Sequence, residues 1–130
     1  MSRRGATSLA GILLLDKPAG MTSHDVVAAV RRATGEGRVG HAGTLDPMAT
    51  GLLLVLVGPY TRLEPYLSSA EKSYDAVIAF GDATDTGDAC GATVETAPVP
   101  EWLFEDTSHA QREVLDSFLG TGMQLSLIHI

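Results

Sequence analysis

The 130-residue chain has one cysteine, few aromatic residues (5%) and no long apolar run. A lone Cys90 cannot form an internal disulfide, which excludes a disulfide-stapled secreted scaffold and favours a reducing compartment. The longest apolar run, residues 52–57, is far shorter than the roughly 20 residues that a membrane-spanning helix needs. No apolar signal core with a cleavage site follows Arg3 and Arg4. We therefore expect a soluble, cytoplasmic protein with no membrane contact.

Charge is unevenly distributed along the chain. The net charge is −7, with 19% charged and 45% hydrophobic residues, which is ordinary for a globular protein and excludes wholesale disorder. Residues 1–62 hold seven Lys/Arg against four acids, whereas residues 63–130 hold two against twelve. A polyanion could therefore contact the first half only, although a solvated surface with uneven charge explains the pattern equally well. The length allows one compact domain.

The pattern of apolar residues and breakers predicts a mixed α and β protein. Continuous apolar runs favour buried strands at 11–16 and 51–57, and alternation favours a half-exposed strand at 73–80 that pairs with a strand at 92–96. Residues 35–43 are expected to be loop and residues 81–91 a polar turn. Helices are expected at 59–67 and at 108–119. The second of these would bury four side chains: Val114, Leu115, Phe118 and Leu119.

A helix is also expected directly after the first strand. Thr22 or Ser23 can serve as its N-cap, and Asp25 stands three residues after Thr22, as in a capping box. Gly35 is placed to end the helix. Its apolar stripe would consist of Val26, Val27, Val30 and Ala33.

Residues 40–51, Gly-His-Ala-Gly-Thr-Leu-Asp-Pro-Met-Ala-Thr-Gly, are the densest candidate for a functional site. Their glycines allow positive φ or a close approach of a ligand to the backbone. Pro47 restricts Asp46 to an extended conformation, so that a stiff turn presents the carboxylate just before a buried strand. Asp-Pro is also a common turn starter, which gives a purely structural alternative.

This segment closely resembles the catalytic motif of the TruB family, the bacterial tRNA pseudouridine synthases that act on uridine 55. Residues 11–23 resemble the family's opening strand and turn, Lys72-Ser73-Tyr74 its tyrosine-bearing strand, and residues 81–91 its following polar turn. The similarity runs from about Gly11 to Gln124. It implies an α+β pseudouridine synthase fold with a mixed, mostly antiparallel sheet and packed helices.

The resemblance implies isomerisation of uridine to pseudouridine in the T-loop of tRNA, with Asp46 as the catalytic carboxylate. Asp46 would attack either the uracil ring or the ribose anomeric carbon, and both routes stay open. No cofactor and no metal are implied. The partner would be the T-arm of tRNA, and the full-length enzyme would be a monomer.

Further roles follow from the same resemblance. Tyr74 would stack on the flipped uracil, and His41 would contact the RNA or support the loop. Lys17 would position the loop or contact a phosphate, although a solvated turn lysine is the alternative. The residues expected to support the catalytic loop are Gly43, Thr44, Asp85 and Asp88.

The sequence also departs from the family pattern. Ala42 stands where threonine is usual, and Leu54 where the following strand often carries proline. The family's later strands and its catalytic-site arginine motif do not follow Gln124. We therefore expect residues 1–124 to be the N-terminal part of the catalytic domain and residues 125–130 to be a non-matching, possibly non-native tail. Such a truncated chain would be inactive alone.

The sequence also suggests two other classes of function. Asp85-Thr86-Gly87 is the active-site tripeptide of retroviral-type aspartic proteases, but the preceding residues 81–84 are not the apolar strand that those enzymes have. A non-catalytic RNA-binding fragment with the same fold is the second alternative. The four histidines are scattered and Cys90 is single, so no metal-ligand spacing is present.

Overall fold

The computed structural model describes residues 8–104, 108–117 and 119–120, and it separates into two compact units, residues 1–74 and 75–130. The expected tail at 125–130 and the side chain of Phe118 lie outside the described residues. No helix in the described part of the chain is long and apolar enough to cross a membrane.

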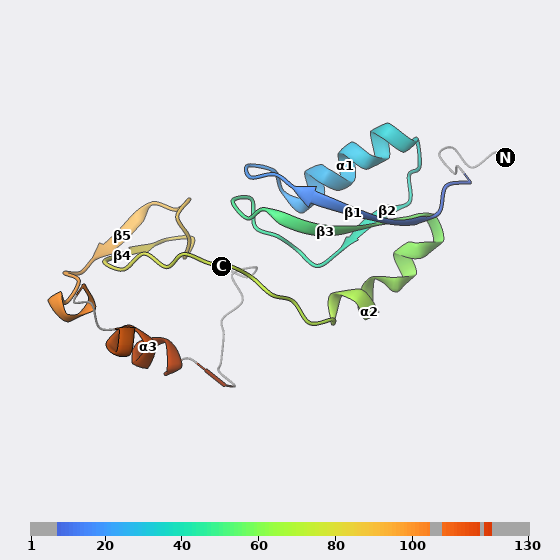
Figure 1. The fold of residues 1–130 in the computed structure, drawn as a ribbon. Coiled ribbons are helices and arrows are strands. Elements are labelled where there is room, and N and C mark those ends of the chain that lie inside the picture. The colour runs from blue at the N-terminus through green and yellow to red at the C-terminus, as the bar shows by residue number, and fades with distance from the viewer. Residues whose placement is uncertain (1–7, 105–107, 118, 121–130) are drawn as a thin grey trace. The chain divides into compact units, whose positions relative to one another are not determined.

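The first unit is built on a three-stranded antiparallel sheet. Strands β1 (Gly11–Lys17), β2 (Val39–Ala42) and β3 (Gly51–Val57) lie in the order β1-β3-β2. Figure 1 shows β3 running between its two neighbours. This central position explains why β3 is a continuous apolar run. The strands predicted at 11–16 and 51–57 are both present, but the predicted burial of the first is wrong, because Ile12, Leu13 and Leu14 are exposed.

Helix α1 (Ser23–Thr34) packs against the sheet. Alternate residues of β3 point toward it, because successive side chains of a strand face opposite sides. The resulting core consists of Val26, Val27, Val30, Val39, Leu53, Val55 and Val57. The predicted capping box is present. The Thr22 hydroxyl accepts from the Asp25 N–H at 3.0 Å, and the Asp25 carboxylate accepts from the Thr22 N–H at 2.9 Å. Thr22, rather than Ser23, is therefore the N-cap, and Gly35 ends the helix with φ of 70°.

The sequence-based prediction for residues 35–43 was partly wrong, because β2 lies within this expected loop. Val39 and Ala42 are buried, and all four residues of β2 pair with the free edge of β3 from Val57 to Leu54. The Gly-His pair inside β2 gives no strand pattern by itself. Tertiary pairing therefore decides the conformation. The expected helix at 59–67 is present as a 3₁₀ helix, η1 (Gly58–Leu63), that continues into α2 (Glu64–Ser68).

The second unit contains a small antiparallel hairpin of β4 (Asp82–Thr84) and β5 (Thr93–Thr96). The strand predicted near 92–96 is confirmed, whereas the strand predicted at 73–80 is wrong. Residues 73–80 are all exposed and none of the described strands pairs with them, so their backbone lacks the ladder of hydrogen bonds that defines a strand.

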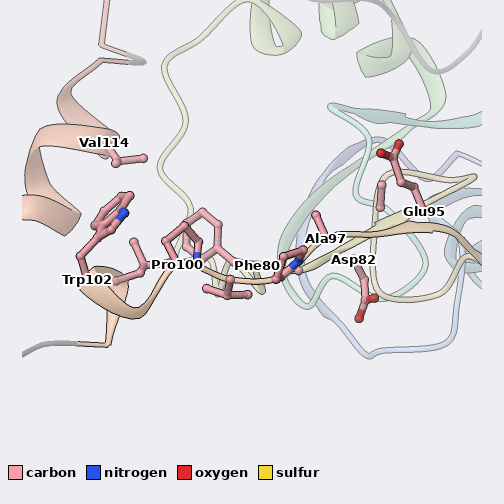
Figure 2. A pocket seen from close by; sticks show the side chains of 12 residues that line it. Phe80, Asp82, Glu95, Ala97, Pro100, Trp102 and Val114 are labelled. Atoms are coloured by element: carbon pink, nitrogen blue, oxygen red, sulfur yellow. The ribbon is translucent and has the colours of Figure 1, made fainter.

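Helices η2 (Glu101–Leu103) and α3 (Ser108–Asp116) complete the second unit. The predicted burial of α3 was largely wrong. Leu115 in α3 is 50% exposed, Leu119 beyond the helix end is 77% exposed, and Val114 is half-buried. Val114 lines an open apolar cavity of about 430 Å³ together with Phe80 and Trp102 (Figure 2).

The capping box predicts a pH-dependent contribution of Asp25 to stability. Hydrogen bonds from Thr22 lower the pKa of the Asp25 carboxyl below its ordinary value of 3.8. Its stabilising contribution is therefore present above that value and is lost as the pH falls through the lowered pKa. Asp25→Asn should lower the free energy of unfolding at neutral pH, and its difference from the parent should vanish in acid.

Urea denaturation followed by far-ultraviolet circular dichroism, at neutral pH and below pH 3.8, measures this difference. Asp75→Asn is the control, because Asp75 is an exposed carboxylate outside any helix. A stability difference for Asp25→Asn that persists unchanged in acid would contradict the assignment.

Candidate active site

Asp46 lies in the loop that joins β2 to β3, at the edge of the first unit's core. Its carbonyl accepts from the Ala49 N–H at 3.0 Å, which closes a tight turn over residues 46–49. The Asp46 side chain is exposed, and no hydrogen bond or ion pair engages its carboxylate within the described residues. The turn therefore presents an unengaged carboxylate next to a rigid strand.

Lys17 fixes the backbone directly after Asp46, at Pro47. Its side chain is completely buried at the end of β1. The ammonium donates to the carbonyls of Pro18 at 3.0 Å, Met21 at 2.6 Å and Pro47 at 3.2 Å. The Gly20 N–H donates to the same Pro47 carbonyl at 2.8 Å. An ammonium has three protons, so all of its donors are used, and the alternative of a solvated turn lysine is wrong.

Two serines hold the N-terminal side of the loop. The Ser23 hydroxyl, 3% exposed, accepts from the Leu45 N–H at 3.0 Å and donates to the Leu45 carbonyl at 3.2 Å. The Ser68 hydroxyl of α2 accepts from the Gly43 N–H at 3.1 Å. Sequence reasoning assigned neither serine to the site. The sequence offered one indication of such a role. Ser23 follows the N-cap Thr22, and the helix does not need a second capping hydroxyl.

His41 lies in β2 and contacts the same loop. Its Nδ1 lies 2.7 Å from the Gly43 carbonyl, and because a carbonyl oxygen only accepts, Nδ1 carries the proton in this contact. Gly43 has φ of 81°, and a Cβ there would lie 3.3 Å from Cε of Lys72. Support of the catalytic loop by His41 and Gly43, and contact of His41 with RNA, stay predictions. Thr44 is exposed.

Tyr74 stands at the end of the first unit with its ring 66% exposed. It lies outside any strand, so the expected strand does not position it. The nearby Lys72 ammonium donates to the carbonyls of Ser68 at 2.6 Å and Ala70 at 3.2 Å, which closes the end of α2. Stacking of Tyr74 on a base remains a prediction.

Asp85 and Asp88 shape the turn between β4 and β5. Asp85 accepts from the Ala92 N–H at 2.8 Å, and Asp88 accepts from the Cys90 N–H at 2.8 Å and from the Thr86 hydroxyl at 2.7 Å. The two hydrogen bonds to Asp88 lower the pKa of its carboxyl, and the bond from the Thr86 hydroxyl has the larger effect. Both carboxylates organise their own hairpin, and their support of the Asp46 loop stays a prediction.

The same turn contains the tripeptide that suggested a protease. Asp85-Thr86-Gly87 follows the short, polar and largely exposed strand β4, so the structure supplies no apolar strand before it. This placement does not favour an aspartic protease. Among the described residues, no group of three or more His, Cys, Asp or Glu side chains is arranged to hold a metal ion.

Replacement of the buried lysine should destabilise the first unit. Lys17→Met keeps most of the side-chain volume but leaves three carbonyl groups without the ammonium, so we expect the free energy of unfolding to fall by about 3 kcal/mol. Urea denaturation measures this. Lys72→Met is the matched control, because Lys72 also donates to carbonyls but is exposed, and it should change stability by at most about 0.5 kcal/mol. Equal effects of the two substitutions would show that burial of Lys17 is not decisive.

The chain is similar in sequence to a family of known proteins. The chain matches the family described as "TruB family pseudouridylate synthase (N terminal domain)" over residues 31–129. It is 54% identical over 105 residues to tRNA pseudouridine synthase B of Thermobifida fusca, covering 81% of this chain and 36% of that protein. It is 47% identical over 116 residues to the protein of the same name from Opitutus terrae, covering 89% and 46%.

A third relative, tRNA pseudouridine synthase B of Gluconacetobacter diazotrophicus, is 42% identical over 129 residues, covering 99% of this chain and 40% of that protein. The chain therefore spans less than half the length of these relatives. The antiparallel α+β fold agrees with the resemblance seen in the motifs. With the family match over most of its length, the chain belongs to the TruB family of pseudouridylate synthases.

Proposed function

We propose that this chain supplies the carboxylate-bearing part of an enzyme that isomerises uridine to pseudouridine at position 55, in the T-loop of tRNA. The observation that carries the proposal is the exposed Asp46 on a turn whose backbone is held on both sides, in a chain of this family. The relatives are named tRNA pseudouridine synthase B, which supports tRNA as the substrate.

The reaction needs a positioned, deprotonated nucleophile. Asp46 attacks the uracil ring or the ribose anomeric carbon, the bond from the ribose to the ring nitrogen breaks, and the base rejoins through C5. C5 then loses its proton, the freed ring nitrogen gains one, and the Asp46 carboxylate is released. No atoms or electrons are gained or lost overall, so the balance of the reaction requires neither an oxidant nor a co-substrate. A carboxylate held on a stiff turn suits either route, because correct placement lowers the barrier of a nucleophilic step.

The target base must leave its stack to reach Asp46. The exposed ring of Tyr74 is the candidate that stacks on it, a contact worth roughly 1–3 kcal/mol. Phosphate contacts fall to exposed arginines in the basic first half: Arg32, Arg38 and Arg62. Arg31 is a weaker candidate, because its guanidinium donates to the Val39 carbonyl at 2.7 Å. We place this activity in the cytoplasm, on the T-arm of tRNA, in a monomeric full-length enzyme.

A non-catalytic RNA-binding fragment is the second candidate. The observation that favours it is the set of exposed arginines in the basic first half, which can bind RNA phosphates without any chemical step. The experiment below separates the two.

The test places this chain in the Thermobifida fusca synthase, in place of the 105 residues that match it. The chimera should convert uridine 55 of a tRNA transcript, detected by mass spectrometry of nuclease fragments after derivatisation of pseudouridine. Asp46→Asn should lower the rate by roughly 10⁴-fold or more, because the nucleophile is removed, and leave tRNA affinity nearly unchanged. Glu95→Gln, an exposed carboxylate on β5, is the control and should retain full turnover.

Different outcomes of this experiment test the catalytic residue, the position of the target uridine and the RNA-binding alternative. Turnover that survives Asp46→Asn would disprove the catalytic assignment. Product at a uridine outside the T-loop would disprove the substrate position. A chimera that folds and binds tRNA without forming product, while the Thermobifida fusca synthase is active in parallel, would favour the RNA-binding fragment.

A further inference from the structure

We propose that Ser23 is a positioning residue for Asp46, an inference that rests on the proposed catalytic role of that aspartate. Ser23 is the first residue of α1, and its hydroxyl reaches across 22 residues of sequence to Leu45, which directly precedes Asp46. One hydroxyl engages both polar groups of that residue's backbone, accepting from the N–H at 3.0 Å and donating to the carbonyl at 3.2 Å.

The helix that carries Ser23 does not need this hydroxyl. Thr22 occupies the N-cap and satisfies the Asp25 N–H, and the Asp25 carboxylate returns the bond to Thr22. The Ser23 side chain is nevertheless 3% exposed, and a buried hydroxyl without partners is costly. Both of its hydrogen bonds go to Leu45, so the loop rather than the helix accounts for a serine at this position.

Ser23 provides one of two backbone contacts that fix the residues on either side of Asp46. On the far side of Asp46, the Pro47 carbonyl accepts from the buried Lys17 ammonium and from the Gly20 N–H. Residues on both sides of Asp46 are therefore tied to the same rigid body, the start of α1 on one side and the end of β1 on the other. Loss of the Ser23 contact would release one side and widen the range of positions of the carboxylate.

Such a change should affect the chemical step rather than binding. A displacement of about 1 Å at a reacting group can cost on the order of 10²-fold in rate. Ser23 is buried and lies behind the loop, so it does not contribute to the surface that tRNA would contact. We expect Ser23→Ala to lower kcat by about 10²-fold with little change in the Kd for tRNA. Ser23→Cys keeps the side-chain size and a weak hydrogen-bond donor, so its kcat should lie between those of the parent and Ser23→Ala.

The experiment combines two measurements. In the 130-residue chain, amide hydrogen exchange followed by NMR should show the Leu45 N–H exchanging at least about fivefold faster in Ser23→Ala, while the Val27 amide in the middle of α1 keeps its protection. In the chimera with the Thermobifida fusca synthase, kcat and the Kd for tRNA are measured for Ser23→Ala and Ser23→Cys. Thr34→Ala is the matched control, because it removes a hydroxyl from the other end of α1 that bonds to the Val30 carbonyl at 2.7 Å.

The inference is supported if Ser23→Ala accelerates exchange at Leu45 and lowers kcat, while Thr34→Ala does neither. It is overturned if Leu45 exchange is unchanged, if kcat is unchanged despite faster exchange, or if Val27 loses protection to the same degree as Leu45. Asp46→Asn, assayed in parallel, separates the two levels. Full turnover in that variant would overturn the proposed function, whereas its loss together with unchanged kcat in Ser23→Ala would overturn the positioning role alone.

Discussion

A buried ammonium is the constraint around which the first unit is organised. Lys17 ends β1 inside the protein, where an unpaired charge would be prohibitively costly, so oxygen atoms must surround it. Three backbone carbonyls meet this need, two from the turn after β1 and one from Pro47, 30 residues further along the chain. The charge thereby joins the end of β1, the approach to α1 and the loop before β3.

This arrangement gives the Asp46 loop a rigidity that loops usually lack. Pro47 is held from the side of β1, Leu45 from the start of α1, and Gly43 from Ser68 of α2. The tethers all bind backbone groups, which leaves the Asp46 carboxylate exposed to a ligand. A catalytic group needs this combination of fixed backbone and accessible side chain, because precise placement of the reacting atom lowers the barrier.

Elements with a strong local signal were predicted correctly. The apolar runs of β1 and β3 are short and flanked by turn residues, which favours strands, and the capped, amphipathic pattern favours helix α1. The errors fall where a segment depends on its partners. Strand β2 contains Gly40 and His41 and forms because β3 offers a free edge, whereas residues 73–80 alternate well but meet no described strand. Leu115 was expected inside and is half-exposed, because little packs against α3.

The amino-acid order alone was enough to predict the family, the strand and helix on either side of the first turn, and Asp46 as the candidate nucleophile. These conclusions depend on contiguous residues, whose order along the chain is enough to recognise them. The burial of Lys17 and the hydrogen bonds between Ser23 and Leu45 could be seen only in the folded protein, since both sets of contacts join residues far apart in sequence. In the sequence, a lysine next to a proline looks the same whether its side chain faces water or the core, and so does a serine next to an N-cap. The physical difference between those states, desolvation offset by hydrogen bonds, exists only once the chain has folded around them.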